Sequence, residues 1–103
     1  MPCWLFTTAK IHDRAALAAG YAPAAAKAAE IYGGKYVVRG PIVEQLEGED
    51  RTGQSAVVLE FPDRAAALGF YHSPEYSAAK KLREGLADIT ISLVEAMPAP
   101  KTS

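Results

Sequence analysis

The chain has few residues of the kinds that build metal and disulfide sites. Cys3 is its one cysteine, and its two histidines, His12 and His72, lie far apart in the sequence. A single cysteine excludes an internal disulfide and a multi-cysteine metal site, and it is typical of a reducing compartment. The histidines lack the spacing of a zinc site. We therefore predict a cytoplasmic protein without a bound metal, in which Cys3 is a small residue of the first strand.

Net charge and long hydrophobic runs are also scarce. The 103 residues carry a formal net charge of −1, with acidic and basic residues mixed along the chain. Such a chain has no electrostatic preference for nucleic acid or for an anionic membrane. Residues 1–13 lack the basic start and the long apolar stretch of a signal peptide or an anchor. No glycine-rich loop leads from a strand into a helix, as phosphate binding requires. We predict no cofactor and neither of these partners.

The chain does contain a regular series of apolar, β-prone segments. Residues 42–48 are predicted to continue the second of these segments in extended form beyond a bend at Pro41, which belongs at a sheet edge or a bulge because proline cannot donate to a ladder. The polar residues 47–54 are typical of a hairpin loop. The predicted strands are 3–9, 35–40, 55–61 and 88–95.

Alanine-rich helices are predicted between the strands. The first should run to the glycine pair at 33–34 and be kinked or broken at Pro23, because proline removes a helical hydrogen bond. The second should end near Tyr71, and the third should span 74–84. The predicted N-caps of the three helices are Asp13, Asp63 and Ser73.

The order of these elements, βαββαβ, indicates an α+β fold of the ferredoxin-like type. Residues 13–21 (DRAALAAGY) and 63–71 (DRAAALGFY) are similar, which supports two β-α-β halves. We predict a four-stranded antiparallel sheet with two helical segments on one face. We assign residues 1–96 to a single domain and residues 97–103 to a flexible C-terminal tail.

The predicted strands are apolar on both of their faces. Segments such as 36–38 and 56–59 do not alternate between apolar and polar residues, as a sheet with one face in water would. The chain has no further helix to cover the second face. A second copy of the same face is the expected cover, so the pattern predicts a homodimer through the sheet.

Five motifs follow one another along the chain: YGGKYVVRG (32–40), VEQLEG (43–48), VVLEFP (57–62), FYHSPEY (70–76) and AAKKLR (78–83). With these motifs in this order, the sequence from about residue 3 to residue 96 resembles the bacterial family called domain of unknown function 1330, within the dimeric α+β barrel superfamily. The resemblance implies a dimer of two ferredoxin-like sheets, with a cleft between each sheet and its helices. It also implies that relatives in the superfamily use this cleft for cofactor-free oxygenation, lactone isomerisation or haem chemistry.

The chain departs from the family pattern at three places. Pro41 stands where members usually carry a second glycine, and residues 49–51 replace a loop that often holds a tryptophan. His72 occupies a position that is often acidic. These departures affect the ligand contacts that the resemblance implies, but they do not change the expected fold.

The segment 70–76, FYHSPEY, is predicted to be mainly a helix start, with Ser73 as its cap. Tyr71 and Tyr76 should pack on the sheet and are candidate ligand contacts. The nearby helix N-terminus favours a neutral imidazole at His72. That residue is either a general base or an exposed side chain. Haem ligation by His72 is disfavoured because the residue precedes a cap instead of lying on a helix face.

Arg39 and Glu60 are charged residues within otherwise apolar strands. Burying either one without a partner would be unfavourable. Arg39 is a candidate for holding an anionic substrate through a forked hydrogen bond. Glu60 is a candidate general base if burial raises its pKa. Alternatively, the two residues form a salt bridge or a contact across the dimer.

These features predict a small cytoplasmic homodimer that binds a small organic molecule in the cleft between sheet and helices. If it is an enzyme, a cofactor-free monooxygenase or an isomerase fits best. The alternative is a non-catalytic module for ligand sensing or interaction. The candidate catalytic residues are Glu60 and His72, and the candidate ligand-binding residues are Arg39, Tyr71 and Tyr76.

Overall fold

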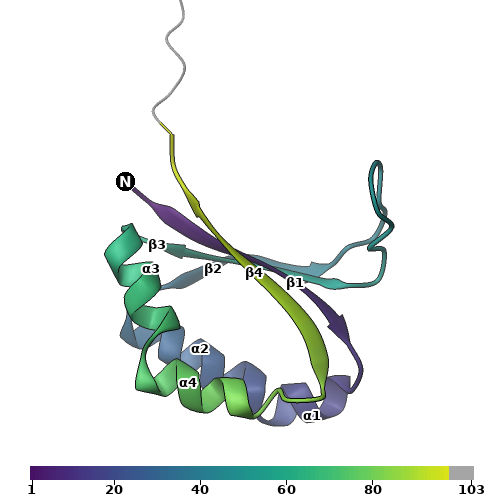
Figure 1. The fold of residues 1–103 in the computed structure, drawn as a ribbon, viewed down its shortest axis with the longest axis horizontal. Coiled ribbons are helices and arrows are strands. Elements are labelled where there is room, and N and C mark those ends of the chain that lie inside the picture. The colour runs from purple at the N-terminus through teal and green to yellow at the C-terminus, as the bar shows by residue number, and fades with distance from the viewer. Residues whose placement is uncertain (98–103) are drawn as a thin grey trace, which may run out of the picture.

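Four strands form one antiparallel sheet in the order β2-β3-β1-β4 (Figure 1). The structure is a computed structural model and describes residues 1–97. Residues 98–103, which make up most of the predicted tail, lie outside the described residues. Pro41 ends an edge strand, as predicted. The strands are β1 (Cys3–Ile11), β2 (Lys35–Pro41), β3 (Ser55–Phe61) and β4 (Ala87–Glu95).

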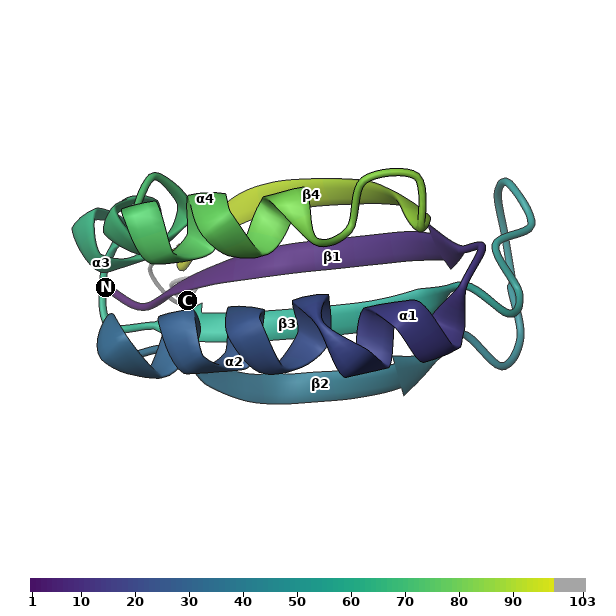
Figure 2. The same ribbon diagram turned by 90° about the horizontal axis from the view of Figure 1, so that it is seen from below.

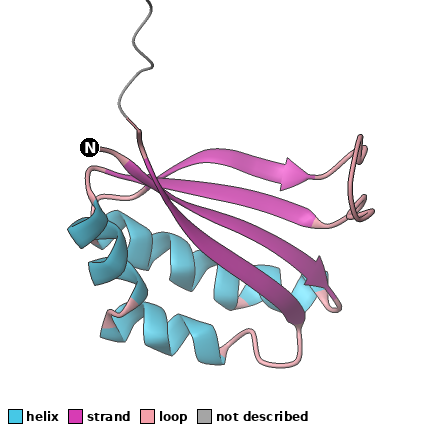
Figure 3. Cartoon of the chain, turned by 45° about the horizontal axis from the view of Figure 1, so that its top comes forward, coloured by secondary structure: helices cyan, strands magenta, loops and turns pink. Residues whose placement is uncertain are grey.

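All the helices of the described residues lie on one face of the sheet (Figures 1 and 3). Figure 2 shows α1 and α2 in line along one half of the sheet and α4 along the other half. Side chains of the three predicted N-caps, Asp13, Asp63 and Ser73, accept hydrogen bonds from the first turns of α1, α3 and α4. The predicted ferredoxin-like fold is confirmed. The helices are α1 (Arg14–Ala19), α2 (Tyr21–Ile31), α3 (Arg64–Tyr71) and α4 (Pro74–Lys81).

The first helical segment is broken, but at Gly20 and not at Pro23. Gly20 lies between α1 and α2, and Pro23 is the third residue of α2. Proline is tolerated in the first turn of a helix, because the amide it lacks would have no helical partner there. The carbonyl of Ala19 would have accepted that missing hydrogen bond in a continuous helix. The break therefore falls at the glycine that precedes the proline by three residues.

Two predicted element boundaries are also wrong. Regular pairing of β2 ends at Pro41, and the extended segment predicted over 42–48 is loop apart from Ile42, whose N–H donates to the Gln54 carbonyl at 2.8 Å. The third predicted helix, α4, ends at Lys81 and not at residue 84. Beyond it the chain tightens into turns, with the Leu82 N–H donating to the Ala79 carbonyl at 2.9 Å.

Among residues 1–97, no helix covers the face of the sheet away from the helices (Figure 3), and part of this face is apolar and open to solvent. The exposed fractions are 48% for Phe6, 49% for Val38 and 38% for Val94. Trp4 and Val58 lie on the same face by the register of β1 and β3. We call this surface, made of Trp4, Phe6, Val38, Val58 and Val94, the outer face. The prediction that segments such as 36–38 and 56–59 place apolar residues on both faces of the sheet is confirmed.

The helices of the described residues are short. None of them is long and apolar enough to cross a membrane.

Candidate ligand site

A cavity of about 250 Å³ lies between the sheet and the helices. Its helix wall comes from one side of α1 and α2, where Leu17, Tyr21 and Ala25 recur at helical spacing. Phe70 and Tyr76 close one end, and both side chains are buried. The sheet wall is formed by alternate residues of three strands, namely Leu5, Thr7, Ala9, Ile11, Ser55, Val57, Leu59, Ile89 and Ile91.

A β-bulge in β2 directs two further side chains to the cavity. The register of β2 against β3 shifts between Tyr36 and Val38, so that Tyr36 pairs with Leu59 and Arg39 pairs with Val57. Leu59 and Val57 both line the cavity. A regular strand would place residues three apart on opposite faces, whereas the extra residue places Tyr36 and Arg39 on the same one. The Arg39 guanidinium lies 5.0 Å from the centre of the Tyr36 ring.

Two tyrosine hydroxyls and an arginine form a hydrogen-bonded group at the helix wall. The Tyr21 and Tyr76 hydroxyl oxygens are 2.7 Å apart. Arg83 Nη1 donates to both of them, at 3.1 Å to Tyr21 and 2.9 Å to Tyr76. Burial, followed by the proximity of the Tyr21 hydroxyl, raises the pKa of Tyr76 far above its ordinary value, although Arg83 opposes this. Burial also raises the pKa of Tyr36, against the opposing effect of Arg39. Both phenols are therefore hydrogen-bond donors at neutral pH.

The structure brings two of the five predicted site residues to the cavity and leaves three outside its lining. Arg39 and Tyr76 line the cavity. Tyr71 packs on the Tyr76 ring with a centroid separation of 5.5 Å, and its hydroxyl accepts from Lys80 Nζ at 3.2 Å. His72 is exposed and lies edge-on to the Tyr71 ring. The roles assigned to these residues stay predictions.

Glu60 lies on the other side of the sheet. Its Oε1 accepts a hydrogen bond of 3.1 Å from the indole nitrogen of Trp4, and the two residues face each other across β3 and β1. Arg39 is directed to the cavity, so the two charges are separated by the sheet. The predicted alternative of a salt bridge between Arg39 and Glu60 is wrong for the residues described, whose ion pairs join other partners.

Three residues that line the cavity, Arg14, Tyr21 and Tyr36, were not predicted as site residues. Arg14 and Tyr21 share the spacing of Leu17 and Ala25 along α1 and α2, so the helical pattern of the first segment contained their signal. Tyr36 had no such signal, because its orientation relative to Arg39 depends on the bulge. The described residues contain no group of three or more His, Cys, Asp or Glu side chains that could hold a metal ion.

Residues 2–97 match the model of the family described as domain of unknown function DUF1330. The chain belongs to this family. The match covers every described element of the fold, including all four strands and all four helices. It confirms the resemblance inferred from the ordered motifs. No curated protein matches the chain significantly.

Solved structures with the same fold come from several bacteria. A protein of unknown function from Rhodopseudomonas palustris, RPA0582, is 23% identical and covers 94% of this chain and 83% of its own, with a TM-score of 0.76. A variant of SnoaB, a cofactor-independent oxygenase from Streptomyces nogalater, is 17% identical over 97% and 98% of the two chains, with a TM-score of 0.66. Rv0793 from Mycobacterium tuberculosis is 12% identical over 98% and 100%, with a TM-score of 0.63. These similarities establish that the chain shares their ferredoxin-like fold.

Proposed function

We propose that this DUF1330 protein binds a small, mainly apolar organic molecule in the cavity between its sheet and its helices. The observation that carries the proposal is the cavity of about 250 Å³, whose walls are mostly aliphatic and aromatic and whose polar groups are few and converge on it. Sites for small molecules have this composition. The buried free thiol of Cys3 supports a cytoplasmic location, because such thiols are typical of reducing compartments.

The chemistry of the lining favours binding over base catalysis. Among the described residues that line the cavity, none is Asp, Glu or His. Tyr76, with its raised pKa, is a donor and would not remove a proton near pH 7. A proton-transfer isomerase would need a base that this lining does not supply. Isomerisation is therefore less well supported than cofactor-free oxygenation.

Cofactor-free oxygenation is the second candidate function. The similarity of fold to SnoaB, a cofactor-independent oxygenase, favours it. A cavity with apolar walls also keeps water away from a reactive intermediate. In this function Arg39 would stabilise negative charge that develops on the substrate, and Tyr76 would donate a hydrogen bond to it. Neither Glu60 nor His72 lines the cavity, so the proposal assigns no step to them.

We propose that the protein acts as a homodimer through the outer face. Three large apolar side chains on this face are more than a third exposed. Contiguous apolar patches of this kind mark interaction surfaces. The one carboxylate on this part of the face, that of Glu60, already accepts a hydrogen bond from Trp4. A second copy would cover the apolar side chains while this carboxylate keeps its hydrogen bond from Trp4.

Ligand binding is tested with a neutral fluorescent probe, N-phenyl-1-naphthylamine, whose emission rises in an apolar site. We expect binding to the unmodified protein. Ala18→Trp should raise the dissociation constant at least about tenfold, because Ala18 lines the cavity and an indole would fill it. Ala19→Trp is the matched control, since Ala19 is exposed on the same helix and is not a lining residue. Absence of probe binding, or equal effects of the two variants, would contradict the proposal.

The oxygenation candidate is tested with the molecule that the protein itself retains. Native mass spectrometry of freshly purified protein should identify a bound organic compound. When this compound is returned to ligand-free protein, an oxygen electrode should record O2 uptake proportional to protein concentration, with no added cofactor and with a chelator present. If the compound is recovered unchanged and no O2 is taken up, the oxygenation candidate would be contradicted and the binding proposal would stand.

A further inference from the structure

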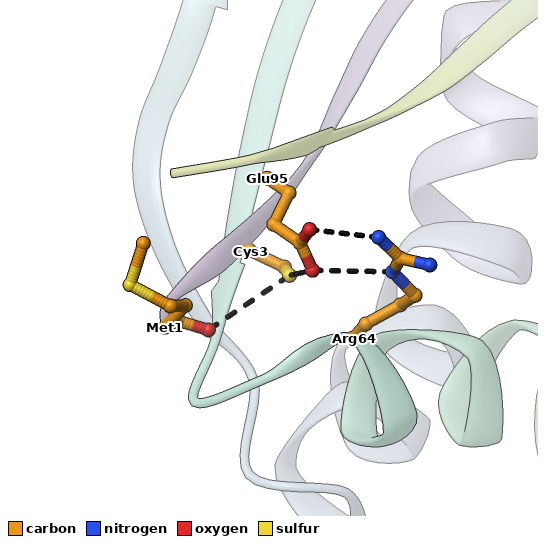
Figure 4. Close-up of polar contacts among 4 residues, drawn as sticks. All are labelled: Met1, Cys3, Arg64 and Glu95. Atoms are coloured by element: carbon orange, nitrogen blue, oxygen red, sulfur yellow. Dashed lines mark hydrogen bonds and ion pairs between the residues drawn. The ribbon is translucent and has the colours of Figure 1, made fainter. Parts of the chain in front are cut away.

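The sequence DRAA occurs twice, and its two arginines have different surroundings. Arg14 and Arg64 are each the first residue of a helix and follow an aspartate N-cap. The helix dipole disfavours a cation at this position. For Arg64 a carboxylate compensates: its Nη2 and Nε donate to the two Glu95 oxygens at 2.7 and 3.1 Å (Figure 4). The same carboxylate lies 3.7 Å from the Cys3 sulfur.

Arg14 has no such compensation. Among residues 1–97 its guanidinium forms no ion pair, and it lines the cavity. Arg39 shares both properties within the same part of the chain. The residues that line the cavity thus include two arginines, whereas none of the described lining residues is acidic. Two positive charges at the exposed end of a cavity with apolar walls favour an anion.

The cations and the closed aromatic end of the cavity lie at different places along the strands. Arg14 follows Ile11, the last residue of β1, and the pairing of β1 with β3 sets Ser55 near the same end. Arg39 lies two pairs further in than Ser55, opposite Val57. Phe70 and Tyr76, each 2% exposed, lie toward the other end, where the Phe70 ring packs 5.3 Å from that of Phe61. The cavity therefore has a cationic, exposed end and an apolar, buried end.

We propose that the ligand is an organic carboxylate with an aromatic or branched apolar body. The body would lie among Leu17, Val57 and Phe70, and the carboxylate would accept hydrogen bonds from Arg39 and Arg14 at the exposed end. A guanidinium matches a carboxylate through two parallel hydrogen bonds, and such charge-assisted bonds are stronger than those of neutral pairs. This inference rests on the proposed binding function and specifies its ligand class.

The test compares two molecules of the same shape, 2-naphthoate and 2-naphthamide, as competitors of the neutral probe. On the unmodified protein we expect naphthoate to displace the probe at about tenfold lower concentration than naphthamide. Arg39→Gln and Arg14→Gln should each weaken naphthoate binding about tenfold and leave naphthamide binding unchanged. The preference for naphthoate should also fall as salt concentration rises.

Arg64→Gln is the matched control, because Arg64 occupies the same position in the repeated motif but does not line the cavity. It removes the same charge from the protein and should leave naphthoate binding unchanged. Equal affinity of naphthoate and naphthamide would overturn this inference while probe binding still supported the proposed function. Equal losses in all three arginine variants would also overturn it. Failure of the probe itself to bind would overturn the proposed function.

Discussion

Replacing Phe6 with glutamate should convert the protein from a dimer into a monomer. Phe6 lies in the central strand β1 with 48% of its surface exposed, flanked on the outer face by Val58 and Ser92. In a homodimer through this face, the variant would bury an unpartnered carboxylate where an aromatic ring had been. The dissociation constant of the dimer should rise by about a hundredfold or more. Sedimentation velocity at micromolar concentration measures the change directly.

The control must add the same charge to another exposed apolar position. Leu68→Glu does so on α3, where Leu68 is 38% exposed on the helix layer, away from the outer face. It should leave the dimer intact. A purely monomeric unmodified protein would contradict the homodimer proposal, and so would a dimeric Phe6→Glu variant. Both variants should keep their circular dichroism spectrum, because both side chains are exposed in the single chain.

In a dimer formed through the outer face, each subunit would have its own complete cavity. The cavity lies between the sheet and the helices, and the outer face lies on the opposite side of the sheet. The alternation of side chains along β1 separates the two, with Leu5 and Thr7 toward the cavity and Trp4 and Phe6 toward the outer face. Loss of dimerisation should therefore not by itself remove the neutral probe's site.

The parts of the fold that could be predicted from sequence are those with a strong local signal. The caps Asp63 and Ser73, and the apolar segments of β1 and β3, each act through neighbouring residues, so their pattern was sufficient. The helix breaks at Gly20 and not at Pro23, because the hydrogen bond that proline cannot form would have reached back to the carbonyl of Ala19. Just beyond α4, the Arg83 guanidinium bonds to Tyr21, which is far from it along the chain, and to Tyr76 of α4, and no local pattern indicates these contacts.

The candidate site was less predictable because its geometry depends on contacts between distant segments. Arg39 was a candidate because it is a charge within an apolar strand, but its shared orientation with Tyr36 depends on the bulge in β2. Glu60 had the same local signal as Arg39 and lies on the opposite side of the sheet, beside Trp4. Only the register of the strands distinguishes two such charges, and no local pattern sets that register.

Phe70→Ala should produce the largest loss of stability among single substitutions in the aromatic cluster. Phe70 is 2% exposed and packs between Phe61 and Tyr76, with ring centres 5.3 and 4.6 Å away. Truncation removes these contacts and leaves a space that rigid neighbours cannot fill. Comparable substitutions lower the free energy of unfolding by about 3–5 kcal/mol. Urea denaturation of both proteins at one protein concentration measures the difference, since dimerisation makes stability depend on concentration.

Leu68→Ala, on the same helix but 38% exposed, is the control for this loss. It should lower the free energy of unfolding by less than about 1 kcal/mol, because little apolar surface is returned to water. Phe70 also closes the buried end of the cavity, so its removal joins the new space to the existing one. Saturating neutral probe should then recover part of the lost stability, because a ligand that binds only the folded state stabilises it. A loss below about 1 kcal/mol in Phe70→Ala would show that the aromatic cluster does not hold the helices on the sheet.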